Sequence, residues 1–73
     1  MSKQYFGIRA HIWADGMMVE VWDKVYYCES AKQAAAYMRR FCDNRIRDCF
    51  DNKASYSLSW VEYGSLLWHP VND

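Results

Sequence analysis

The stretch RAHIWADGMMVEVW, residues 9–22, decides the fold because it reads as two alternating segments joined by a tight turn. Asp15-Gly16 is a strong signal for a type I′ hairpin, since both residues tolerate the positive φ that this turn requires. Counting outward from the turn predicts which side chains face each other on the apolar side of the hairpin: Ala14 with Met17, Ile12 with Val19, and Ala10 with Val21. The stretch therefore predicts a β-hairpin with one apolar face.

The opposite face of this hairpin has the composition of a binding surface. Its members are Arg9, His11, Trp13, Met18, Glu20 and Trp22. The cores of protein interfaces are enriched in Trp, Tyr, Met and Arg relative to the rest of the solvent-exposed surface. In this register Trp13 pairs with Met18, Arg9 stacks on Trp22 as a cation–π pair, and His11 faces Glu20. We predict that the face binds a partner, with Tyr5 and Tyr26 as neighbours.

The pattern outside this stretch predicts the remaining elements. The second strand continues to about residue 28 with Val25 and Tyr27 facing inward, and Asp23-Lys24 marks a bulge or bend. Ser30 and Gln33 have the spacing of a capping box, which predicts a helix start. Apolar residues then recur at helical spacing: Ala31, Ala34, Ala35, Met38, Phe41, Cys42, Ile46, Cys49 and Phe50. The helix either runs to about residue 51 or breaks at Asp43-Asn44.

A second hairpin is expected after an exit turn at residues 51–53. Tyr56, Leu58 and Trp60 alternate with serines, Gly64-Ser65 suits a type II′ turn, and residues 66–68 form a short return strand that Pro70 ends. The order β-β-α-β-β predicts an α+β fold for one domain, residues 1–73. Its simplest form is a four-stranded antiparallel sheet with one helix packed on one face.

Composition limits the classes of function. Nine basic and nine acidic residues among 73 cancel, which excludes a strongly basic nucleic-acid binder and an acidic mimic of DNA. Three cysteines are an odd number for a disulfide framework. The N-terminus lacks the apolar run of a signal peptide, and no stretch is long enough to span a bilayer. We expect a protein of the cytoplasm without a membrane partner.

The chemical motifs are weak. Cys28, Cys42, Cys49 and His69 lack the close pairs typical of zinc sites, and a free cysteine usually packs as a small apolar residue. His11 and Glu20 could orient an imidazole, but no activated nucleophile or phosphate-binding loop accompanies them. We therefore expect no metal, no cofactor and no enzymatic activity.

Two alternatives to protein binding remain open. Aromatic residues on an open sheet beside Arg9 are typical of sheets that stack RNA bases, and Arg39, Arg40 and Arg47 would then contact phosphates. Aspartates interleave with these helix arginines, which favours a solvated helix face instead. The other alternative is a structural homodimer, which would also stabilise a domain of this size.

The layout of residues 5–63 resembles that of small phage-encoded inhibitors, including inhibitors of host RNA polymerase and anti-CRISPR proteins. The resemblance lies in a hairpin followed by the capped, alanine-rich segment ESAKQAAAY, residues 29–37, and another strand. That class is defined by the lifestyle of its members and not by shared residues, so no functional positions can be transferred from it to this sequence. This neutral chain also differs from the acidic members of the class. The resemblance implies a steric inhibitor without activity of its own. The leading hypothesis is a module that binds and blocks a larger host protein or ribonucleoprotein.

Overall fold

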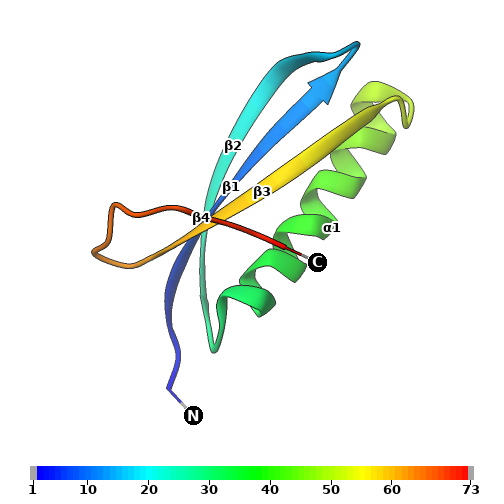
Figure 1. Cartoon of the computed structure of the whole chain (residues 1–73). Helices are drawn as coiled ribbons and strands as arrows, with labels where there is room; N and C mark the ends of the chain where they lie inside the picture. The colour runs from blue at the N-terminus through cyan, green and yellow to red at the C-terminus, as the bar shows by residue number, and fades with distance from the viewer. Residues whose placement is uncertain (1, 73) are drawn as a thin grey trace.

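The computed structural model describes residues 2–72 as a four-stranded antiparallel sheet and a single helix (Figure 1). The elements are β1 Gln4–Ala14, β2 Met17–Cys28, α1 Ala31–Phe50, β3 Ala54–Glu62 and β4 His69–Pro70. The strand order is β2-β1-β3-β4, and α1 packs on one face of the sheet. This confirms the predicted α+β fold. We call the face under α1 the inner face and the opposite one the outer face.

The core lies between the inner face and α1. Alternate residues of β1 point into it, as the sequence predicts: Phe6, Ile8, Ala10 and Ile12. The helix contributes Ala34, Ala35, Met38, Cys42 and Ile46. Ala34 and Ala35, near the N-terminal end of the helical stripe, let this part of α1 approach the sheet closely, so the aromatic and aliphatic side chains of β1 fill the space beside them.

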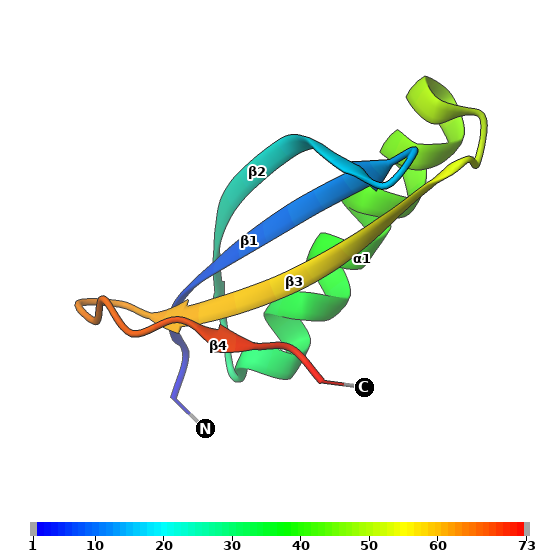
Figure 2. The same ribbon diagram turned by 45° about the horizontal axis from the view of Figure 1, so that its top comes forward.

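The register of the first hairpin differs from the prediction. Asp15 and Gly16 have φ of 54° and 75°, as a type I′ turn requires, and Trp13 pairs with Met18. Beyond that pair the register shifts, so that Ile12 lies opposite Glu20 and Val19 has no partner in the ladder. This β-bulge replaces the bulge expected at Asp23-Lys24. β2 is accordingly drawn as a curved strand in Figure 2.

Because side chains alternate with a period of two, the bulge turns most of β2 over. Trp22 and Tyr26 now pack against the core, whereas Val21, Val25 and Tyr27 are exposed on the outer face. The physical reason is that both phases of β2 carry large apolar residues. The flipped phase packs the aromatic rings of Trp22 and Tyr26 against the core in place of valines, and such rings bury more surface than a valine does.

The helix is continuous from Ala31 to Phe50, so the alternative break at residues 43–44 is wrong. The Ser30 hydroxyl accepts a hydrogen bond from the Gln33 backbone N–H at 3.1 Å, which confirms the predicted N-cap. The Gln33 side chain in turn accepts from the Glu29 backbone N–H. Asp51 and Asn52 adopt left-handed conformations and end the helix at the expected exit turn.

The second hairpin forms with a later return strand than predicted. Its turn is centred on Tyr63-Gly64, because the Ser65 N–H donates to the Glu62 carbonyl at 3.0 Å and Gly64 has φ of 82°. Residues 65–68 are irregular, and β4 is His69–Pro70 instead of residues 66–68. His69 stacks on Trp60, with ring centroids 4.4 Å apart, at the start of the return strand, which thus begins three residues later than predicted. The loop projects away from α1 (Figure 1).

Candidate binding surface

The outer face presents rows of side chains, each row running from β2 across β1 to β3. The register places these residues side by side: Tyr27, Tyr5 and Tyr63; Val25, Gly7 and Val61; Asp23, Arg9 and Ser59; Val21, His11 and Ser57; Met18, Trp13 and Ser55. No element of residues 2–72 covers this face as α1 covers the other. Among the predicted binding residues, Tyr5, Arg9, His11, Trp13 and Met18 lie together here.

A row of tyrosines forms one end of the outer face. The ring of Tyr5 lies 4.8 Å from that of Tyr27 and 6.0 Å from that of Tyr63, measured between centroids. All three rings are at least half exposed, and Tyr63 is 82% exposed. Such a row offers flat apolar surface with hydroxyl groups at its rim, which is typical of protein interfaces.

An ion pair occupies the central row. Arg9 donates two hydrogen bonds to Asp23, at 2.8 and 3.0 Å, and its guanidinium lies 4.3 Å from the ring centroid of Trp68. The predicted stacking of Arg9 on Trp22 is therefore wrong. The bonds from Arg9 lower the pKa of Asp23, so the pair stays ionised at neutral pH. The two charges cancel, and the centre of the face carries no net charge.

Trp68 lies over Gly7 on the outer face of the sheet. A Cβ at this position would lie 3.8 Å from Trp68 Cη2 and 3.0 Å from Val61 Cγ1. Trp68 thus covers part of β1 inside the face, over Gly7 and Arg9, while Leu66 and Leu67 of the same loop remain exposed. A glycine inside an otherwise regular strand signals such a close approach, but which segment approaches is decided by the tertiary fold.

The other end of the face is an apolar strip along β2. Trp13, Met18, Val21 and Val25 are between 41% and 68% exposed. The sequence prediction missed Val21, Val25 and Tyr27, which it placed in the core. The sequence did contain a signal of this. In the run Met17-Met18-Val19 beside the turn, consecutive residues are all apolar, so the pattern does not show which set of β2 side chains faces the core.

Two predicted binding residues lie on the inner face instead. Trp22 packs edge-on against Phe41, with centroids 5.2 Å apart, and the Tyr26 hydroxyl donates to the sulfur of Met38 at 3.7 Å. Both are partly buried against the core. Their assignment to the outward face was wrong because the bulge reverses the phase of β2.

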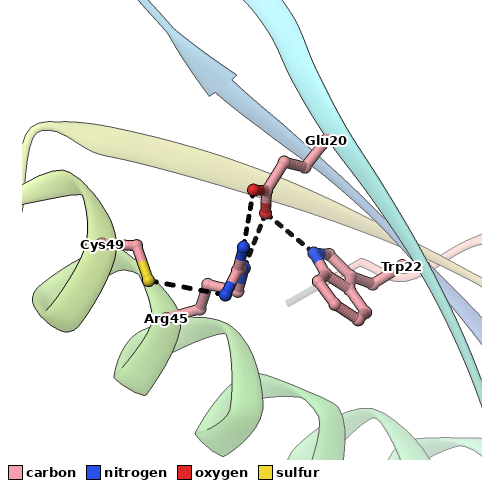
Figure 3. Close-up of polar contacts among 4 residues, drawn as sticks. All are labelled: Glu20, Trp22, Arg45 and Cys49. Carbon is pink, nitrogen blue, oxygen red and sulfur yellow. Dashed lines mark hydrogen bonds and ion pairs between the residues drawn. The ribbon is translucent and has the colours of Figure 1, made fainter.

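Glu20 holds the edge of the sheet to the helix, as Figure 3 shows. Its carboxylate accepts two hydrogen bonds from Arg45, both at 2.7 Å, and one from Trp22 Nε1 at 2.8 Å. These bonds, the Arg45 ones first, lower the pKa of Glu20 to about 2. The predicted partnership of His11 with Glu20 is therefore wrong, because His11 lies on the outer face. Arg45 also donates to the exposed Cys49 thiol.

The helix arginines proposed as phosphate contacts do not converge. Arg47 is paired with Asp48 at 2.9 Å, Arg40 is exposed on the helix, and Arg39 borders two hollows beside β3. The hollow shared with Lys32, Trp60 and Val71 has a volume of about 310 Å³. The arginines thus lie around α1 and not on the outer face.

Within residues 2–72 there is no group of three His, Cys, Asp or Glu side chains placed to hold a metal ion. Cys28 and Cys42 are buried, and burial first of all raises the pKa of the Cys42 thiol to about 11. No helix among these residues has the length and apolar character needed to cross a membrane.

The fold and its exposed face define a small α+β domain with one helix-covered and one uncovered sheet face. Comparison with protein-family models, with curated proteins and with solved structures gave no match to this chain.

Proposed function

We propose that this chain is a protein-binding module whose recognition surface is the outer face of its sheet. The observation that carries the proposal is the exposed apolar surface at both ends of the outer face, with the tyrosine row and Val25 on one side of the Arg9–Asp23 ion pair and Val21, Trp13 and Met18 on the other. Exposed apolar patches rimmed by polar residues on a small domain typically mark an interaction site. The aromatic residues would be the binding hot spots, since truncation of such anchors commonly costs about 2 kcal/mol or more of binding free energy.

The charges of the surface favour a protein over a nucleic acid. Phosphate binding needs several uncompensated cations, and binding then weakens steeply with salt. On the outer face Arg9 is neutralised by Asp23, and on the helix Arg45 and Arg47 are neutralised by Glu20 and Asp48. The aromatic rows would stack bases, but Arg9, the arginine among them, is already paired with a carboxylate.

A module of this kind acts by occupying a surface of its partner. Together with the resemblance to small phage inhibitors, this supports a steric, non-enzymatic inhibitor of a larger host protein or ribonucleoprotein. The absence of net charge implies a partner surface that is itself apolar and weakly charged.

The test is capture of partners from bacterial lysate on the tagged full chain, with and without nuclease. Trp13→Ala and Tyr27→Ala alter the outer face, while Tyr37→Ala on α1 is the matched control, because Trp13 and Tyr37 are 41% and 44% exposed. We expect a defined protein that survives nuclease, is retained by Tyr37→Ala and is lost from both outer-face variants. Loss of all material with nuclease would move the function to nucleic acid, and equal capture by all variants would exclude this face.

A further inference from the structure

We propose that the open edge of β3 pairs with the same edge of a second copy of this chain, so that the two sheets join into one. The pairing would be antiparallel, about a two-fold axis that is perpendicular to the sheet and passes beside Ser55. This edge is separate from the outer face, so the inference goes beyond the proposed function. Its consequence is a dimer that presents two outer faces on the same side of a continuous sheet.

The first part of β3 has no strand beside it on the side opposite β1. β4 pairs only with Ser59 and Trp60, and Figure 2 shows it beside one end of β3. The next contact toward the start of β3 is a single hydrogen bond of 2.9 Å, which the Val71 N–H donates to the Leu58 carbonyl. Within residues 2–72, the sheet provides no partner on this side for residues 54–57.

That hydrogen bond shows which backbone groups point to the open edge. In an antiparallel sheet, the N–H and C=O groups of successive residues of a strand point alternately to its two sides. The Leu58 carbonyl points away from β1, so the N–H and C=O groups of Tyr56 and Ala54 point the same way. The groups of Ser55 and Ser57 point to β1 instead. The open edge therefore offers two donors and two acceptors that have no strand beside them.

The open part of β3 lacks the features that usually protect a sheet edge, which are charged side chains, proline or a bulge. β2 has a bulge at Val19 and the inward charges of Glu20 and Lys24. β4 is two residues long and contains Pro70. Residues 54–60, ASYSLSW, contain no charge and no proline, and they pair with β1 without a register shift. This edge is therefore the one that suits strand addition.

A two-fold axis beside Ser55 pairs all of the open backbone groups. Ala54 of each copy then faces Tyr56 of the other, and each facing pair exchanges two hydrogen bonds, which gives four bonds in total. The two Ser55 side chains meet at the axis on the outer side, where their small size leaves room for close approach. On the inner side the Tyr56 ring of one copy lies beside the Ala54 methyl group of the other. Such a contact of one edge with itself closes a dimer and leaves no open end for a third copy.

The surroundings of this edge leave room for a short partner strand. A hollow of about 350 Å³ opens beside it and is lined in part by Tyr56 and Leu58, so α1 leaves the edge accessible. Val71 occupies the position beside Leu58, and the exit turn of the helix limits the other end. The pairing about Ser55 uses only the groups between these two limits, whereas a longer strand of another protein would meet Val71.

The first experiment is sedimentation velocity of the full chain from about 10 µM to 1 mM, because an interface this short should dissociate in this range. We expect the mass to rise from that of an 8.7 kDa monomer toward twice that value. Ser55→Lys and Ser55→Glu, measured separately, set two like charges at the axis and should stay monomeric. An equimolar mixture of the two variants should regain the dimer, because opposite charges then face each other.

The matched controls are Val25→Lys and Val25→Glu, because Val25 is 68% exposed on β2, at the opposite edge of the sheet. Each should dimerise like the wild type. Hydrogen exchange of the backbone amides then locates the contact. Exchange at Ala54 and Tyr56 should slow as the protein concentration rises, whereas exchange at Ser55 and Ser57, whose amides point to β1, should not change.

Four results would each overturn the inference. They are a wild type that stays monomeric over the whole range, a mixture of the Ser55 variants that stays monomeric, Val25 variants that lose the dimer, and exchange at Ala54 and Tyr56 that does not change with concentration. None of these results depends on capture from lysate or on the outer face, so the proposed function can fail or stand separately.

Discussion

The register of β2 makes opposite predictions for two substitutions close together in the sequence. In the bulged register Trp22 packs on the inner face and Val25 is 68% exposed. In the unbulged register that the sequence pattern suggests, Val25 would be buried and Trp22 exposed. Trp22→Ala and Val25→Thr therefore distinguish the two arrangements by their effects on the free energy of unfolding.

The expected magnitudes follow from the contacts. Truncation of a fully buried tryptophan costs about 3–5 kcal/mol. Trp22 is partly buried, so loss of its packing on Phe41 and of its bond to Glu20 should cost about 2–3 kcal/mol. Val25→Thr keeps the branched shape and should cost less than about 0.5 kcal/mol where exposed, but about 1–3 kcal/mol if its hydroxyl were buried without a partner.

Urea unfolding, followed by far-ultraviolet circular dichroism, measures the change in the free energy of unfolding of each variant, and thermal unfolding measures the change in Tm. For a domain of this length the loss at Trp22 corresponds to a fall of about 10–20 °C in Tm, whereas Val25→Thr should leave Tm nearly unchanged. Trp22→Phe, which keeps a ring but lacks the indole N–H, should lie between wild type and Trp22→Ala. A large loss at Val25 together with a small one at Trp22 would refute the bulged register.

Three further results are expected. Because the folded-state pKa of Glu20 lies below its ordinary value of 4.5, its contribution to stability should be present above about pH 5 and disappear as pH falls toward 2; urea midpoints of wild type and Glu20→Gln should converge at the acid end. Gly7→Val should crowd the Val61 side chain, whose Cγ1 would lie 3.0 Å from the new Cβ, and destabilise the fold by about 1–3 kcal/mol, which thermal unfolding would show, and an unchanged Tm would contradict the close packing at Gly7. The exposed Cys49 should react with a thiol reagent at pH 8 well before the buried Cys42; equal labelling by mass spectrometry would contradict this order.

The local signals of the sequence gave the correct elements. Asp15-Gly16 specifies its turn through backbone conformations that few other pairs adopt. Ser30 and Gln33 specify the helix start through two hydrogen bonds, and the alternation of β1 selects its buried residues. These features depend on neighbours within a few positions along the chain, so the α+β order could be derived from sequence alone.

The membership of the binding surface could be predicted only in part. Residues of β1, such as Arg9 and Trp13, were placed correctly because their strand has one apolar phase. β2 has apolar residues in both phases, so its pattern cannot choose between them. The choice depends on the helix, which offers Phe41 to Trp22 and Arg45 to Glu20 from positions about twenty residues away along the chain.

The amino-acid sequence by itself determined the kind and order of the secondary structure, the turn at Asp15-Gly16 and the neutral charge. Tertiary packing decided which side of β2 faces the core, where the return strand begins and that Trp68 lies over Gly7. The physical reason is that turns and caps are specified by short-range backbone geometry, whereas a single unpaired residue at Val19 reverses the part of β2 that follows it. That reversal is stabilised by contacts that exist only once α1 lies on the sheet.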